Sequence, residues 1–144
     1  MLKLGVYPQP LGPIGVSRAD VRDVAEDAAL ALLQEGHIGK TYDIVGPRGL
    51  NGEETARLWS EALGREVKYA GDDLDAWEKA NAAYLPASML YDLRLMYQHF
   101  QRKGLLATPQ KVAALTAVLG HAPRSFEAFA AEMASAWAGE LAAR

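Results

Sequence analysis

Histidines and serines are the first side chains of this sequence to test for catalytic or metal chemistry. His37, His99 and His121 lie far apart, and none belongs to a pair with metal-binding spacing. His37 and His121 each follow a glycine at an expected helix end, which predicts exposed histidines at turns, and His99 is expected on a helix, partly exposed. No serine has the context of a nucleophile elbow. The sequence predicts no metal site and leaves the catalytic residues unknown.

Two acidic clusters could form carboxylate sites. The first holds Asp20, Asp23, Glu26 and Asp27. Asp20 can cap a helix by accepting from its first free N–H groups, and we expect the other three acids on a solvated helix face. The second cluster holds Asp72, Asp73 and Asp75. It lacks the glycine and terminal glutamate of a calcium loop, which favours a turn followed by a helix cap.

Phosphate-binding loops are not found among the glycine-rich turns. Gly46-Pro47-Arg48-Gly49 and Gly12-Pro13-Ile14-Gly15 have the wrong spacing, and their prolines remove a backbone donor. The sequence therefore predicts no cofactor-binding residue in the isolated chain.

Composition excludes several classes of protein. The net charge is −3 over 144 residues, which argues against nucleic acid as a main partner. There is no cysteine, so disulfides, zinc–thiolate sites and thiol nucleophiles are excluded. No stretch approaches the ~20 apolar residues of a membrane span, and the start MLKLGVYPQPLG is unlike a signal peptide. We expect a cytoplasmic protein without membrane contact.

The chain is organised around a helix that leads into a strand. The helix begins after Asp20 and ends at Gly36, and the strand is Thr41–Val45, closed by a Gly-Pro turn. The helix has one apolar stripe, formed by Val21, Val24, Ala25, Ala28 and Leu32. A helix followed by a short strand is half of an α/β crossover unit.

The remaining elements are mostly helices. Strands are expected at Leu2–Tyr7 and Glu66–Ala70, with a short extended piece at Ile14–Val16. Helices are expected from Asn51 to Gly64, after Asp72 or Asp73, over 87–102, from Thr108 to Gly120 and after Ser125. The expected fold is a single α+β domain over 1–144, mostly helical, with two to four short strands.

Two stretches of the chain resemble a known family. Residues 17–69 read SRADVRDVAEDAALALLQEGHIGKTYDIVGPRGLNGEETARLWSEALGREVKY, and residues 119–137 read LGHAPRSFEAFAAEMASAW. They resemble the second half and the end of NmrA-like proteins, which are atypical short-chain dehydrogenase/reductases that bind NAD(P). The family's helix cap after Gly-Pro corresponds to Asn51, and its helix-opening aspartates to Asp20 and Asp23.

The resemblance implies that the glycine-rich nucleotide-binding half of the family is absent. Residues 1–47 would then be the remnant of the last Rossmann α/β unit, and 48–144 the helical substrate-side region. NAD(P) is implied only by the family. A small-molecule ligand would lie on the substrate side, for which we name Tyr7, Pro8, Trp77, Tyr84, Tyr91 and Tyr97, because pockets are mostly apolar and aromatic with a few polar tips.

Three functions remain open at this point. The first is a small-molecule-binding or self-associating module without its own dinucleotide site. The second is an NAD(P)-dependent oxidoreductase of the quinone reductase kind, completed by another chain. The third is a small hydrolase with a new pocket between the helices. We expect a homodimer or larger homo-oligomer, because one strand edge and one apolar flank lack the family's first half.

Overall fold

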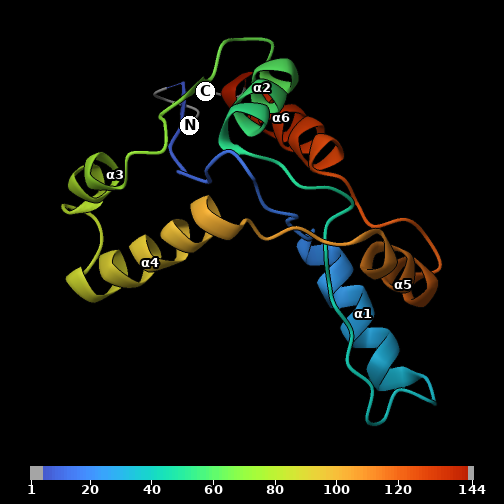
Figure 1. Ribbon diagram of the computed structural model, residues 1–144. Helices are drawn as coiled ribbons and strands as arrows, with labels where there is room; N and C mark the ends of the chain where they lie inside the picture. The colour runs from blue at the N-terminus through green and yellow to red at the C-terminus, as the bar shows by residue number, and fades with distance from the viewer. Residues whose placement is uncertain (1–4, 143–144) are drawn as a thin grey trace. The chain divides into compact units, whose positions relative to one another are not determined.

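The computed structural model describes residues 5–142 (Figure 1). These residues divide into two compact units. One unit combines Met1–Val16 with Leu50–Leu105, and the other combines Ser17–Gly49 with Leu106–Arg144. The chain thus enters each unit twice. The expected single domain divided near residue 47 remains a prediction.

The first unit contains the only strands found in the described part of the chain. β1 (Val6–Tyr7) pairs in parallel with β2 (Lys68–Tyr69), with Tyr7 opposite Tyr69. The expected strand over residues 2–7 is therefore described only at its end, since residues 2–4 lie outside the described residues. The expected extended piece at Ile14–Val16 contributes single bridges from Val16 to Leu50 and Leu105.

α2 (Gly52–Leu63) packs against both strands and buries its apolar face, including Leu58 and Trp59. The capping box is confirmed, because Asn51 accepts from the Glu54 backbone while the Glu54 carboxylate accepts from Asn51. Gly64 ends the helix in the left-handed region, with φ of 63°.

α3 (Leu74–Asn81) and α4 (Ala87–Lys103) pack against each other in the same unit. Asp73 caps α3 by accepting from the N–H groups of Asp75 and Ala76, as expected for the Asp72–Asp75 cluster. α4 ends at Gly104, as its sequence predicts.

The second unit holds α1 (Val21–Leu33), α5 (Pro109–Leu119) and α6 (Phe126–Ala142), with α1 in contact with α5 (Figure 1). The expected caps are confirmed: Asp20 caps α1, Thr108 caps α5 and Ser125 accepts from the Ala128 backbone. Among the described residues, no helix has both the length and the apolar character needed to cross a bilayer.

The expected strand Thr41–Val45 is wrong. This segment is extended but makes no ladder with any other described segment. The N–H of Gly46 donates to the carbonyl of Ser17, so the segment returns to the start of α1. A strand exists only by pairing, and no neighbour within the described residues offers its backbone to this one.

The expected solvated acidic face of α1 is also wrong. Asp23 is fully buried and Asp27 is nearly so, whereas Val21 is 76% exposed and Leu32 85% exposed. At 100° per residue, the apolar stripe lies on the face of the helix opposite the two buried aspartates. α1 therefore turns its acidic side inward and its apolar side to solvent.

Candidate functional site

The six residues predicted for a substrate site all lie in the first unit, and two of them form a ring pair. Trp77 on α3 and Tyr97 on α4 form an edge-to-face pair with ring centroids 5.1 Å apart. Tyr7 is buried against Tyr69, and its hydroxyl donates to Gln9. Elsewhere in the unit, Pro8, Tyr84 and Tyr91 are exposed. The Trp77–Tyr97 pair is the part of the predicted set that could form one wall of a site.

A network of hydrogen bonds in the first unit holds the loop that follows β1. Asp72 accepts from the backbone N–H of Gly12 at 2.7 Å and from the Tyr69 hydroxyl. The Gln101 side chain donates to the carbonyls of Pro10 and Asp72. Burial and the neighbouring Asp72 carboxylate raise the pKa of Tyr69 well above its usual range. Tyr69 therefore keeps its proton at neutral pH and acts as a fixed donor rather than as a base.

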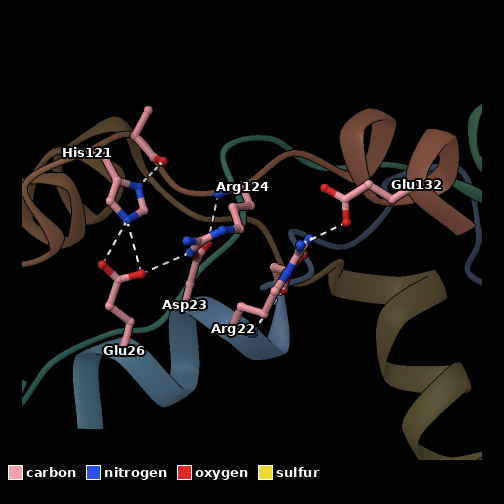
Figure 2. A network of polar contacts seen from close by, with 8 residues as sticks. Arg22, Asp23, Glu26, His121, Arg124 and Glu132 are labelled. Atoms are coloured by element: carbon pink, nitrogen blue, oxygen red, sulfur yellow. Dashed lines mark hydrogen bonds and ion pairs between the residues drawn. The ribbon is translucent and has the colours of Figure 1, made fainter. Parts of the chain in front are cut away.

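A polar cluster lies in the second unit, where α1 faces the segment before α6 (Figure 2). The carboxylate of Asp23 accepts from both the backbone N–H and the guanidinium of Arg124. The same guanidinium lies 3.1 Å from Glu26, which is also 3.1 Å from the His121 ring. We call Asp23, Glu26, His121 and Arg124 the acid–base cluster.

The charged partners shift the ionisation of this cluster. His121, then Arg124, hold the pKa of Glu26 below its usual value. The Ala122 carbonyl, then Glu26, raise the pKa of His121. A second ion pair extends the contact to α6, since Arg22 bridges Asp20 and Glu132 (Figure 2). The hydrogen bond from the Arg22 side chain lowers the pKa of Asp20.

Sequence reasoning missed this cluster. His121 was expected to be exposed at a turn, but it is half-buried and bonded to Glu26, and His37 is likewise half-buried and bonded to Tyr42. Asp23 and Arg124 are 101 residues apart, so no local spacing links them. The available signal was that both fall in the stretches resembling one family.

The cluster has the ligand types of a metal site but not its electrostatics. One ligand atom each from Asp23, Glu26 and His121 lie within 4.8 Å of one another. However, the Arg124 guanidinium already contacts both carboxylates and supplies the positive charge that a metal ion would bring. We assign the cluster an ion-pair role.

A pocket of about 340 Å³ adjoins the cluster between the start of α1 and the start of α6. The Arg18 guanidinium lies 4.4 Å above the ring of Phe126, which is a cation–π contact. The remaining wall is formed by Ala19, Asp20, Val21, Arg124, Ser125 and Phe129. The volume falls at the lower end of the range for small-ligand pockets.

The second unit has a wider groove of about 790 Å³ along α5. Its walls are mostly apolar and come from Pro47, Gly49, Leu106, Ala107, Pro109, Val112, Ala113 and Ala117, with Arg48 and Thr116. Neither the pocket nor the groove contains a residue of the predicted substrate set.

The described residues do not fit the pyrophosphate of a dinucleotide. Such a site needs free backbone N–H groups at a helix start after a glycine-rich turn. The first turns of α1, α2, α3 and α6 carry acidic residues, which repel phosphate. α5 starts with Pro109 and α4 directly after Pro86, so neither start follows a glycine-rich turn.

Comparisons with known proteins show what the chain is similar to. No protein-family model matches it. It is 33% identical over 138 residues to an NAD(P)H azoreductase of Xenophilus azovorans, covering 92% of this chain and 46% of the relative. It is 30% identical over 136 residues to a (4-alkanoyl-5-oxo-2,5-dihydrofuran-3-yl)methyl phosphate reductase of Streptomyces griseus, covering 94% and 47%. The chain thus spans about half the length of these relatives.

Solved structures agree on the fold. An NADPH-dependent quinone oxidoreductase of Escherichia coli superposes with a TM-score of 0.79 at 21% identity, covering 92% of this chain and 47% of that one. A triphenylmethane reductase of Citrobacter sp. superposes with a TM-score of 0.77 at 20% identity, covering 92% and 45%. The resemblance is thereby confirmed: the chain is a homologue of NAD(P)H-dependent reductases and has the fold of NmrA-like proteins over about half of their length.

Proposed function

We propose that this chain forms the substrate-side half of an NAD(P)H-dependent reductase that a nucleotide-binding half completes. The observation that carries the proposal is the 33% identity to an NAD(P)H azoreductase along 92% of the chain. A second relative, at 30% identity, is also a reductase. The cofactor contacts would come from the other half, because the helix starts described above do not fit a pyrophosphate.

The exposed face of α1 supports a missing half. Val21, Val24 and Leu32 present an apolar stripe to solvent, and contiguous exposed apolar surface usually marks an interface. The extended segment Thr41–Val45 is rich in β-favouring residues and has no strand neighbour among the described residues. A single α/β body could cover the stripe and pair with the segment at the same time.

The aromatic pair of the first unit supports an acceptor with a flat ring. The half-buried Trp77 would offer its ring to such a molecule, which is how aromatic side chains bind other rings, while the buried Tyr97 packs edge-to-face against Trp77. The relatives suggest the class of acceptor, an azo compound or a quinone. In this proposal Trp77 binds and orients the acceptor, the buried Tyr97 holds the Trp77 ring in place, and neither residue takes part in proton transfer.

A chimera tests the proposal. This chain would replace the matching region of the Xenophilus azovorans azoreductase, and NADPH consumption would be measured with an azo dye and with a quinone. We expect the chimera to consume NADPH, and the chain alone neither to consume nor to bind it. Low-micromolar binding of NADPH by the chain alone would contradict the need for a second half. A folded chimera that binds NADPH but reduces neither acceptor would contradict the substrate role.

Two variants of the chimera test the aromatic wall. Trp77→Ala should raise KM for the acceptor more than it changes kcat, because it removes binding surface away from the chemistry. Leu95→Ala is the matched control, since Leu95 is an exposed apolar residue on the neighbouring helix α4. Equal KM values for the two variants would show that the Trp77–Tyr97 pair does not contact the acceptor.

A second candidate function is the self-associating module, and the exposed α1 stripe also favours it. A second copy could cover the stripe by two-fold symmetry and give the homodimer expected from the sequence. Light scattering after size exclusion separates the two candidates. A stable dimer that becomes monomeric in the Val24→Glu variant would favour the module, whereas a monomeric wild type would favour the reductase half.

A further inference from the structure

The ring of His121 has a hydrogen-bond acceptor at each nitrogen. Nδ1 lies 2.8 Å from the carbonyl oxygen of Ala122, and Nε2 lies 3.1 and 3.2 Å from the two carboxylate oxygens of Glu26 (Figure 2). A neutral imidazole carries one N–H and could satisfy only one of these acceptors. The imidazolium, with an N–H at both positions, satisfies both. The geometry therefore fits the protonated ring.

The charges of the acid–base cluster also favour a protonated His121 ring. Asp23, which is fully buried, and Glu26 supply two negative charges, and Arg124 supplies one positive charge. Protonated His121 is the second cation, so the cluster balances only in that state. A buried carboxylate needs such compensation because it has lost its hydration.

The groups facing His121 come from two parts of the second unit. On α1 they are Glu26, which raises the pKa of His121, and Asp23, which is held by Arg124. In the segment before α6 they are the Ala122 carbonyl, which also raises this pKa, and the Arg124 guanidinium, which lowers it. The neighbouring Arg22–Glu132 pair joins α1 to α6 but does not involve the ring.

We propose that His121 is a pH-sensitive latch that holds residues 121–125 against α1. In the latched form the protonated ring bonds to Glu26, and the backbone of Arg124 bonds to Asp23. Loss of the ring proton removes one hydrogen bond and leaves the cluster with one excess negative charge. The latched form is then less stable, although the bonds between Asp23 and Arg124 remain, and the segment is released more often, together with the wall that Arg124 and Ser125 give to the pocket containing Phe126.

The sign of the effect follows from linkage. A histidine whose pKa is higher in the latched form than in the released form stabilises the latched form at low pH. This contribution is complete below the ordinary histidine pKa of about 6.5 and is lost as the pH rises through the value of the latched form. Each pKa unit between the two forms changes the latch equilibrium about tenfold.

NMR titration of the intact chain is the direct test. We expect the His121 ring to titrate above the ordinary value, and the protection factor of the Arg124 amide, corrected for intrinsic exchange, to fall several-fold across that titration. His99, which is exposed on α4, is the internal reference within the same sample. A His121 pKa at or below the ordinary value overturns the proposal, as does an Arg124 protection factor that stays constant across the titration.

Variants separate the latch from a purely structural role. Glu26→Gln should lower the His121 pKa while leaving the ring in place. His121→Gln should remove the pH dependence of Arg124 protection, whereas His99→Gln should leave it unchanged. If His121→Gln does not fold, the Glu26→Gln titration decides, and a His121 pKa unaffected by Glu26→Gln would overturn the latch.

Discussion

Helices α1 and α2 have similar amphipathic sequences and opposite surroundings. α2 packs against β1 and β2, and its Leu58 and Trp59 are buried, so its apolar face is covered. α1 buries Asp23 and Asp27 and leaves Val21 and Leu32 to solvent. The difference shows that periodicity identifies an apolar face, whereas only the rest of the fold decides whether that face is covered.

The largest expected effect comes from truncating the buried apolar face of α2. Trp59→Ala should cost about 3–5 kcal/mol of unfolding free energy, because it leaves a cavity among packed residues. Leu32→Ala in α1 should change the unfolding free energy by less than about 0.5 kcal/mol, because Leu32 is already exposed. Urea unfolding measures both values. Similar losses in the two variants would mean that the two apolar faces are equally covered in solution.

A charge introduced into the apolar stripe of α1 should lower stability only when another part of a protein covers that stripe. Val24→Glu should leave the stability of the chain alone unchanged, but in the azoreductase chimera it should cost about 2 kcal/mol or more, because it buries a charge without a partner. Leu95→Glu is the matched control, since Leu95 on α4 is 46% exposed and Val24 is 44% exposed. Thermal melts of both proteins provide the measurement. If both substitutions change the stability of the chimera equally, the azoreductase half does not cover the α1 stripe.

The buried acidic side of α1 should give a smaller loss. Asp23→Ala should cost about 1–3 kcal/mol, since it leaves the backbone N–H of Arg124 unpaired and removes one carboxylate from its guanidinium. Arg124 keeps Glu26 as a partner, which limits the loss. Glu53→Ala is the control, an exposed acid in the first turn of α2 that should cost below about 1 kcal/mol. Equal losses by urea unfolding would show that Asp23 contributes no more than a helix-end charge.

The sequence predicted what is decided locally. The caps at Asp20, Asn51 and Thr108 are confirmed, because a cap depends on a side chain and on backbone groups two or three residues away. The strand at Thr41–Val45 failed because pairing depends on a neighbour that local composition does not reveal. Among the candidate site residues, Trp77 and Tyr97 meet because one helical hairpin carries both.

Long-range charge pairing explains the failures at the acid–base cluster. Asp23 was placed on a solvated face because acidic residues are seldom buried without a cation. That cation, Arg124, lies beyond both α2 and the α3–α4 hairpin in sequence. The buried acidic side of α1 thus depends on a partner that is distant in sequence, which a local pattern does not reveal.

The smallest expected effect is a difference in how the two helices respond to acid. The pKa of Glu26 is lowered by His121 and Arg124, and that of Asp20 by Arg22. A carboxyl whose pKa is lower in the folded state stabilises that state above its unfolded value of about 4 and loses this contribution as the pH falls through the folded value. α2 is held by its apolar face, whose burial does not depend on protonation.

Amide protection, corrected for intrinsic exchange, should therefore fall in α1 before it falls in α2 as the pH is lowered from about 5 to about 3. In the Glu26→Gln variant the decline in α1 should be shallower, because one of the responding carboxyls is gone. Equal loss of protection in both helices, in wild type and variant alike, would show that the ion pairs of α1 do not set its stability. The two helices would then differ only in whether their apolar faces are covered.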